Sequence, residues 1–368
     1  MVSIEMLDFE QAAQYFESFV KICRIDGQDG SFYGGKANKL IGESVIEHTD
    51  SFPMFLSHND NAAINLTFSA PKSFSILLEL TDNSVLRDKL IEMHDNSVCK
   101  TTGYIENNLI VTRVSKGKDF RGKRVNDLVP PDKGVEWAAF RYHASSESDP
   151  HLYTNVVIAN RIYIKGEKYS IDARDLFKYL IALGKMYRAE LYNELQAGWI
   201  GVKITDYKNF FFAIEGISEE TIHTFSKQSK NIDKAFMELM SELPDEPEAR
   251  LKEFANLESR PDQGRTETLE EIRTRWKEES PQKHVNYIEK PVILANMEDA
   301  AEAAAEAAGR LQPLDFFSDL DFRNLIKQII IFKGLRFDET IIQAAFKTAV
   351  KKRLVKEIDK HVFTVKRG

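Results

Sequence analysis

Two stretches of the chain alternate between apolar and polar residues, which is the pattern of a half-buried β-strand. In residues 62–69 the apolar positions are Ile64, Leu66 and Phe68, with a polar residue after each. Residues 135–143 and 151–164 alternate in the same way, and the polar segment 144–150 joins them. The second pair of strands is therefore predicted to form a β-hairpin.

Apolar residues at helical spacing predict several helices around these strands. The first begins at Asp8, which can cap it together with Gln11, and Tyr15 falls on the flank of its apolar stripe. Further helices are predicted over 72–80, 84–108, 172–197, 218–241 and 266–279. Residues 1–285 are thus expected to form one α+β domain in which a small antiparallel sheet is flanked by helices.

The carboxy-terminal part of the chain has a different pattern. Residues 286–312 include an alanine-rich stretch with no bulky face to bury, which we interpret as a helical spacer or linker. Residues 313–368 predict helices followed by short strands whose end is typical of the wing of a winged-helix fold. We therefore expect three parts: 1–285, the linker 286–312, and a small winged-helix-like domain over 313–368.

Charge is informative locally rather than globally. The 368 residues include 50 Lys and Arg against 57 Asp and Glu, a formal net charge of −7, so contact with nucleic acid requires a local basic patch. Such a patch occurs within 113–124, interleaved with glycines, and Lys72 could add to it. It comprises Arg113, Lys116, Lys118, Arg121, Lys123 and Arg124. These residues are predicted to bind DNA phosphates, although a solvated hairpin tip is an equally simple interpretation.

Composition also bounds the location of the protein. Cys23 and Cys99 are too few for a disulfide framework, and the sequence contains no signal peptide and no apolar run long enough to span a bilayer. A cytoplasmic protein without membrane contact is the expectation.

Strand parity places polar side chains together. Asn65, Thr67, Tyr142, Tyr153 and Asn155 are predicted to share one sheet face. That face is either solvated, covered by the 172–197 helix, or a substrate-facing site on rigid strands. His143 and His151 give a weak indication of a metal site, since their side chains need not point the same way.

Three blocks resemble the MobF-type (TrwC/TraI-like) conjugative relaxases. They are 65–73 (NLTFSAPKS), 140–160 (FRYHASSESDPHLYTNVVIAN) and 179–191, and the similarity keeps family order over roughly 8–280. The resemblance implies an HUH-type relaxase fold. It also implies nicking at a transfer origin: a tyrosine attacks the phosphodiester and stays joined to the 5′ phosphate, three histidines hold a divalent metal, and an aspartate assists.

This chain departs from that pattern at the site itself. Tyr15 matches the nucleophile, but Asn65 replaces the aspartate, and Tyr142, Tyr153 and Asn155 occupy the three histidine positions. A phenol with a pKa near ~10 is a poor metal ligand at neutral pH, and an amide oxygen carries no charge. We expect no cofactor; Mg²⁺, Mn²⁺ or Zn²⁺ would need another ligand set, such as His151, Asn155 or Asp149.

The leading hypothesis is a relaxase-like protein that binds single-stranded or hairpin DNA and has lost most metal-dependent nicking. One alternative is an active DNA strand-transferase that acts through Tyr15 with a rearranged metal site. The other is a protein-interaction scaffold that does not bind DNA. The sequence has no Gly-x-x-x-x-Gly-Lys-Ser/Thr loop, so it does not encode ATP-driven unwinding.

Overall fold

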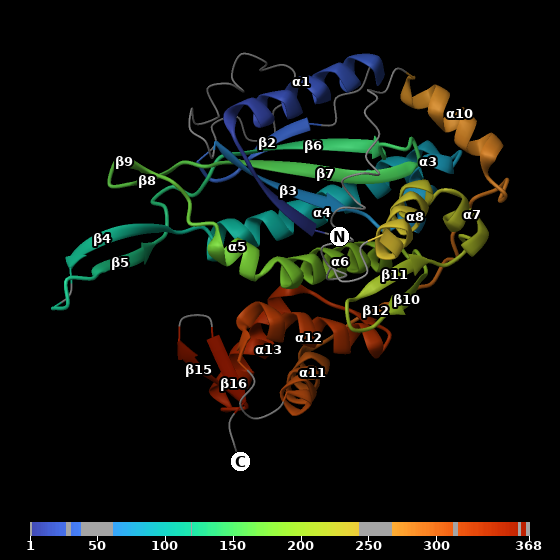
Figure 1. The fold of residues 1–368 in the computed structure, drawn as a ribbon. Helices are drawn as coiled ribbons and strands as arrows, with labels where there is room; N and C mark the ends of the chain where they lie inside the picture. The colour runs from blue at the N-terminus through green and yellow to red at the C-terminus, as the bar shows by residue number, and fades with distance from the viewer. Residues whose placement is uncertain are drawn as a thin grey trace.

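A five-stranded antiparallel sheet organises the larger part of the molecule (Figure 1). The computed structural model describes residues 2–26, 31–37, 62–118, 120–242, 267–311, 316–359 and 362–365. The strand order is β1-β3-β7-β6-β2, with bounds β1 (Val2–Leu7), β2 (Ser31–Gly34), β3 (Ala63–Ser69), β6 (Trp137–Ala144) and β7 (Pro150–Ala159). The predicted strand at 62–69 and the predicted hairpin are confirmed as β3 and β6–β7, whereas β1 and β2 at the sheet edges were not anticipated.

Helices cover both faces of this sheet. On one face lies α1 (Phe9–Asp26), whose first turn is closed by reciprocal hydrogen bonds between Asp8 and Gln11, as predicted. The other face carries α3 (Lys72–Leu80), α4 (Ser84–Asn108) and α6 (Leu180–Ala197). Tyr187 of α6 packs on Phe68 with ring centroids 5.5 Å apart, on the face opposite to Thr67. The expectation that the 172–197 helix covers the polar face is therefore wrong, because α1 covers it.

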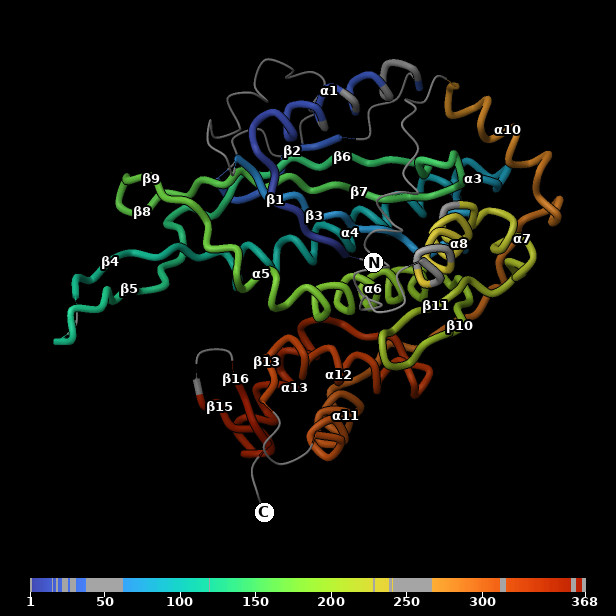
Figure 2. Tube along the Cα trace, in the orientation of Figure 1, coloured from blue at the N-terminus to red at the C-terminus, as the bar shows by residue number. Residues whose placement is uncertain are grey.

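Smaller elements decorate this body. The predicted basic loop is a two-stranded arm that projects from one end of the sheet (Figure 2). The elements are β4 (Thr112–Lys118), β5 (Arg124–Val129), β8 (Ile162–Ile164), β9 (Glu167–Tyr169), α5 (Arg174–Lys178), β10 (Val202–Asp206), β11 (Phe211–Ile214), α7 (Glu219–Thr224), α8 (Lys227–Glu242) and α10 (Leu269–Glu279). Within the described ranges, every helix is too short or too polar to cross a membrane.

The carboxy-terminal unit has winged-helix connectivity. Its elements are β12 (Ile293–Leu294), α11 (Met297–Arg310), β13 (Phe317–Ser318), α12 (Asp319–Phe332), β14 (Leu335–Arg336), α13 (Glu339–Lys351), β15 (Val355–Asp359) and β16 (Val362–Val365). The small sheet has the order β13-β16-β15, so the strand before α12 pairs with the last strand of the terminal hairpin. A helix, a strand, two helices and a hairpin in this order form a winged helix.

The alanine-rich segment is not a free spacer. Ala300, Ala303, Ala304, Ala307 and Ala308 of α11 are buried, and α11 packs against α12 and α13. Small side chains let helices approach closely, so an alanine face can be buried without bulky residues. The linker interpretation of 297–310 is therefore corrected, while the domain bounds at 285 and 313 stay predictions.

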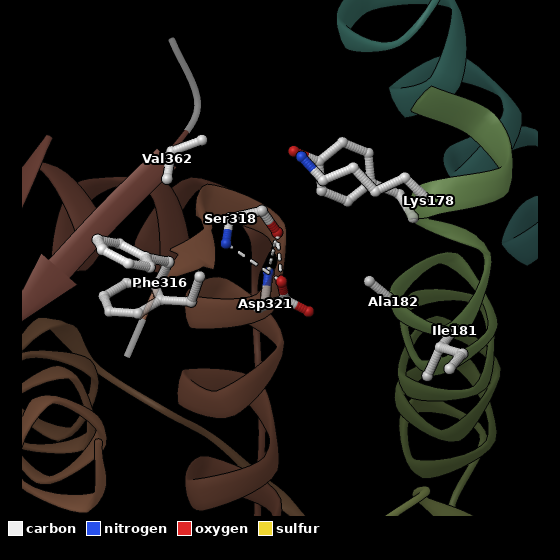
Figure 3. Close-up of a pocket in the computed structure, with 9 residues that line it drawn as sticks. Lys178, Ile181, Ala182, Phe316, Ser318, Asp321 and Val362 are labelled. Carbon is white, nitrogen blue, oxygen red and sulfur yellow. Dashed lines mark hydrogen bonds between the residues drawn. The ribbon is translucent and has the colours of Figure 1, made fainter. Parts of the chain in front are cut away.

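The carboxy-terminal unit is joined to α6 by buried polar contacts. Lys327 Nζ lies 2.6 Å from Glu190 Oε1 and 2.7 Å from Glu339 Oε2, and Asn324 donates to the carbonyl of Ala182. A cavity of about 350 Å³ remains beside this contact, with Ile181 of α6 on one side and Phe316 on the other (Figure 3). The two parts are thus packed together rather than tethered.

Candidate functional site

The register of the central strands brings the predicted polar face together. Tyr142 of β6 lies opposite Tyr153 of β7, and Thr67 of β3 lies opposite Asn155. Asn65 lies two positions before Thr67 on β3, and therefore on the same face, and it pairs with Val157 of β7. Parity therefore predicted this gathering correctly. The face is overlaid by α1, whose backbone carries position 15; the side chain of Tyr15 lies outside the described part of the chain.

The two tyrosines at histidine positions of the family form a stacked pair. Their ring centroids are 4.8 Å apart and their planes differ by 8°. Phe19 of α1 meets the Tyr142 ring edge-on, with centroids 5.3 Å apart. Tyr142 is consequently part of the apolar core between α1 and the sheet. Aromatic pairs in such geometry stabilise a protein beyond their buried area.

The two amides on this face have different surroundings. The Asn155 side-chain oxygen accepts a hydrogen bond of 2.8 Å from the Thr67 hydroxyl. Asn65 is 2% exposed, and its buried Oδ1 has no hydrogen-bond partner among the described residues. An unsatisfied buried acceptor costs free energy, so a donor at this position would be bound favourably.

The metal that the family resemblance implies does not fit these donors. A neutral phenol binds divalent metals weakly, and the rings of Tyr142 and Tyr153 are packed against one another in a stack. The amide oxygen of Asn155 is already an acceptor for Thr67. Among the described residues, no group of three or more His, Cys, Asp or Glu side chains is placed to hold an ion. We therefore derive no step through a metal.

The proposed alternative ligands Asp149 and His151 line a cavity of about 700 Å³ where β3 ends and β7 begins, and the His151 ring lies 5.3 Å from the Tyr153 ring, centroid to centroid. Asp149 is 1% exposed, its Oδ2 accepts a 2.7 Å bond from the Lys227 amide, and the ammonium of Lys227 lies 3.6 Å from Oδ1. Burial raises the pKa of Asp149, which the Lys227 amide and the cations Lys72 and Lys227 oppose. Burial lowers the pKa of His151 to about 3, with Lys72 acting in the same direction. Such cationic surroundings disfavour a divalent metal at Asp149 and His151.

Lys72 belongs to this cavity and not to the basic arm. Its ammonium donates a 3.0 Å bond to the carbonyl of Pro150, and burial lowers its pKa to about 8 despite the attraction of Asp149. Lys72 is the first residue of α3, which lies at the end of the sheet opposite to the arm (Figure 1). The expectation that Lys72 extends the arm's basic patch is therefore wrong. Arg188 of α6 lines the same cavity, which the sequence did not indicate.

All six basic residues of the arm are exposed, and the two nearest its base also form ion pairs. Arg113 at the base binds Asp172 at 2.8 Å, and Lys116 binds Asp127 across the arm at 2.6 Å. Toward the tip, Lys118 lies directly opposite Arg124 in the β4–β5 register. The exposed cations there are Lys118, Arg121, Lys123 and Arg124. Like charges that face each other across a ladder repel, so this end of the arm favours a bound anion.

The tip also carries an aromatic residue that the sequence reading missed. Phe120 is 91% exposed, and the Arg121 guanidinium lies over its ring at 5.1 Å from the centroid. Its signal in the sequence is an aromatic residue placed among cations and between Gly117 and Gly122. Both glycines have positive φ, which side chains with a Cβ rarely adopt.

Comparison with known proteins matches this architecture to one family. A family model described as TrwC relaxase matches residues 10–282. The multifunctional conjugation protein TraI of Escherichia coli is 27% identical over 188 residues, which is 49% of this chain and 10% of that protein. The TraI protein of strain K12 is 26% identical over the same length. The chain thus matches about a tenth of the length of these relatives.

Solved structures agree on the fold. The metal-free complex of conjugative relaxase TrwC with oriT DNA superimposes with a TM-score of 0.63 at 22% identity, covering 78% of this chain and 100% of that one. TrwC complexed with a 27-mer DNA comprising the recognition hairpin and the cleavage site gives a TM-score of 0.61 at 22% identity, covering 76% and 97%. Because the family model matches residues 10–282, which is most of the chain, this chain belongs to the TrwC relaxase family.

Proposed function

We propose that this chain binds DNA in which a hairpin adjoins a single strand, and that metal-dependent nicking is lost or strongly weakened. The observation that carries the proposal is the stacked Tyr142–Tyr153 pair at two of the family's metal positions. This tyrosine pair occurs in a chain that also has an exposed basic arm. Loss of a metal removes several kcal/mol of transition-state stabilisation, whereas phosphate binding by the arm does not depend on it.

The arm's residues supply the contacts that such DNA requires. Lys118, Arg121, Lys123 and Arg124 are exposed and neutralise phosphates, which carry no sequence information. Phe120 offers a ring on which an unpaired base can stack. Arg113 and Lys116 act differently: their ion pairs hold the arm in shape. DNA binding therefore rests on the distal half of the arm.

The test is a binding titration in fluorescence anisotropy with a labelled oligonucleotide that carries a hairpin and a single-stranded tail. Between about 50 and 200 mM salt, the logarithm of the association constant should fall linearly with the logarithm of the salt concentration. The slope should be near −0.9 per phosphate contact on duplex DNA and about −0.7 per contact on single-stranded DNA. Binding that is undetectable, or insensitive to salt, would refute the proposal. The protein-interaction scaffold would then be the better hypothesis.

A second candidate is covalent strand transfer by Tyr15, because this residue lies on α1, the helix that overlays the polar face. Attack by its hydroxyl would form a phosphotyrosine bond and release a 3′-hydroxyl end. Incubation with a broad oligonucleotide pool should then yield a denaturation-resistant adduct that is absent in Tyr15→Phe. We expect no adduct with the unmodified protein. An adduct that depends on Tyr15 would instead establish the enzyme.

A further inference from the structure

The carboxy-terminal unit lies beyond the part of the chain that the family model matches, which ends at residue 282. Its α12 and α13 are joined by the segment 333–338, which contains Gly334 with positive φ and the two-residue strand β14. Two packed helices joined by a short glycine-containing turn are the helix-turn-helix arrangement, in which the second helix presents the reading face. Here that second helix is α13.

One face of α13 is polar and exposed. Thr340, Gln343, Lys347 and Lys351 recur at helical spacing and are all exposed. On the opposite side Ile342, Ala345 and Ala349 are buried against the rest of the unit. The exposed face thus combines a hydroxyl and an amide, which can read base edges, with ammonium groups that can bind phosphates.

The cations of this region are not offset by acids in sequence. Residues 340–356 contain no Asp or Glu, and their exposed cations are Lys347, Lys351, Lys352, Arg353 and Lys356. Glu339, the acid just before them, is turned toward Lys327 at 2.7 Å and Arg323 at 3.3 Å. The basic surface therefore covers the exposed face of α13 and the turn that follows it, and it ends at the start of β15, where the exposed Glu357 adjoins Lys356.

The same unit is acidic elsewhere. Three glutamates are exposed on α11, which packs against α12 and α13: Glu298, Glu302 and Glu306. Charge is therefore divided between these helices, with Glu298, Glu302 and Glu306 exposed on α11 and cations exposed on α13 and in the turn after it. A surface that merely keeps a domain in solution mixes both signs, whereas a segregated basic face attracts a polyanion.

We propose that α13 and the turn after it form a second nucleic-acid site, which binds double-stranded DNA with α13 in the major groove. The major groove is about 12 Å wide and admits an α-helix, while the basic residues at the end of α13 and in the turn after it, Lys351, Lys352 and Arg353, meet the flanking phosphates. This site is separate from the basic arm and does not depend on the function proposed for it. It would hold duplex DNA beside the strand that the larger domain binds.

The test uses the full chain, a blunt duplex of about 20 base pairs and a single strand of the same length, titrated in fluorescence anisotropy. The variant is Lys347→Gln with Lys351→Gln, and the matched control is Lys89→Gln with Lys203→Gln, two exposed lysines of α4 and β10. Two lost phosphate contacts should weaken duplex binding roughly tenfold or more and lower the salt slope by about 2. The control should match the unmodified protein, and circular dichroism should show that all three proteins are folded.

Two results would overturn the proposal. Equal duplex affinity of the α13 variant and the control would mean that this face does not bind duplex DNA. An equal loss for duplex and single strand would mean that it attracts any polyanion, without a fit of α13 to the groove. Failure of the arm to bind hairpin DNA would leave this inference unaffected, because the variants are on different surfaces.

Discussion

Tyr142 and Tyr153 form an aromatic stack at positions where the family resemblance implies metal ligands. Their stack and the edge contact with Phe19 use the site for packing. Replacement by histidine at Tyr142, Tyr153 and Asn155 should restore a donor set that divalent metals prefer. We expect this triple variant to be less stable without metal, because aromatic packing is lost, and to gain thermal stability on addition of Mn²⁺ or Ni²⁺ according to RT ln(1 + [L]/Kd).

The control for that experiment is Tyr142→Phe with Tyr153→Phe, which keeps the rings and removes the hydroxyls. It and the unmodified protein should show no metal-dependent shift in melting temperature. A shift of equal size in the unmodified protein would mean that another ligand set exists, and would contradict the expected loss of the metal site.

Lys72 provides a pH-dependent test at the same scale. Burial lowers its pKa from 10.5 to about 8. Between those pH values, the Lys72 amine is protonated in the unfolded chain but largely deprotonated in the folded chain. The free energy of unfolding therefore rises with pH through this window. Below pH 8 the folded chain carries the cost of the buried charge. The stability of the protein relative to Lys72→Met should increase from pH 8 to 10.5 in urea titrations. Lys89→Met, at an exposed lysine, should show no such rise.

In the basic arm, the same two cations are expected to lower the stability of the hairpin and to raise its affinity for DNA. Because Lys118 and Arg124 lie directly opposite each other, replacing both with Gln should stabilise the arm by a few tenths of a kcal/mol up to about 1 kcal/mol. The same variant should bind hairpin DNA more weakly, with a salt slope smaller by about 2. Hydrogen exchange of the β4–β5 amides measures the first effect and anisotropy the second. Unchanged DNA affinity would remove the arm from the binding surface.

Elements differ in how far the sequence predicts them. Alternation predicted β3, β6 and β7 because each has one buried and one polar face, and parity then assembled the polar face without any knowledge of register. The arm was predicted as a basic loop or hairpin over 113–124, but not the bounds of its strands, because most of their residues are exposed and Gly117 interrupts them, so no alternation marks their length. The burial of α11 was missed because alanines that pack closely leave no bulky stripe in the sequence.

The contacts of the candidate site residues were harder to predict than the set of residues on the polar sheet face. The cavity beside Lys72 and Asp149 draws its lining from α3, β7, α6, β11 and α8, and no local pattern connects segments so far apart in the chain. Likewise, the sequence identified Arg113 and Lys116 as cations, but their partners Asp172 and Asp127 became evident with the fold. Residue types were readable from the sequence, whereas their pairings required tertiary structure.

The junction between the two parts decides whether the whole molecule behaves as one body. Burial alone would disfavour the charged form of Lys327, but Glu190 and Glu339 outweigh it and raise the pKa of Lys327. Without Lys327 the buried carboxylate of Glu190 keeps the half-exposed Lys100 at 3.6 Å as a cation, so the loss costs up to the roughly 3–5 kcal/mol of breaking a buried ion pair. Lys327→Met should therefore lower the free energy of unfolding by an amount of this order and expose the α12–α6 contact to limited proteolysis.

A compensating variant separates charge from packing at this junction. Glu190→Leu combined with Lys327→Met removes the ion pair and fills its volume with apolar groups, which is often neutral or stabilising. We expect the double variant to recover most of the lost stability in denaturant titrations. If Lys327→Met unfolds at the same denaturant concentration as the unmodified protein, the junction contributes little to stability. The carboxy-terminal unit would then move independently of the sheet domain, and DNA bound by each part would not be held in a fixed relation.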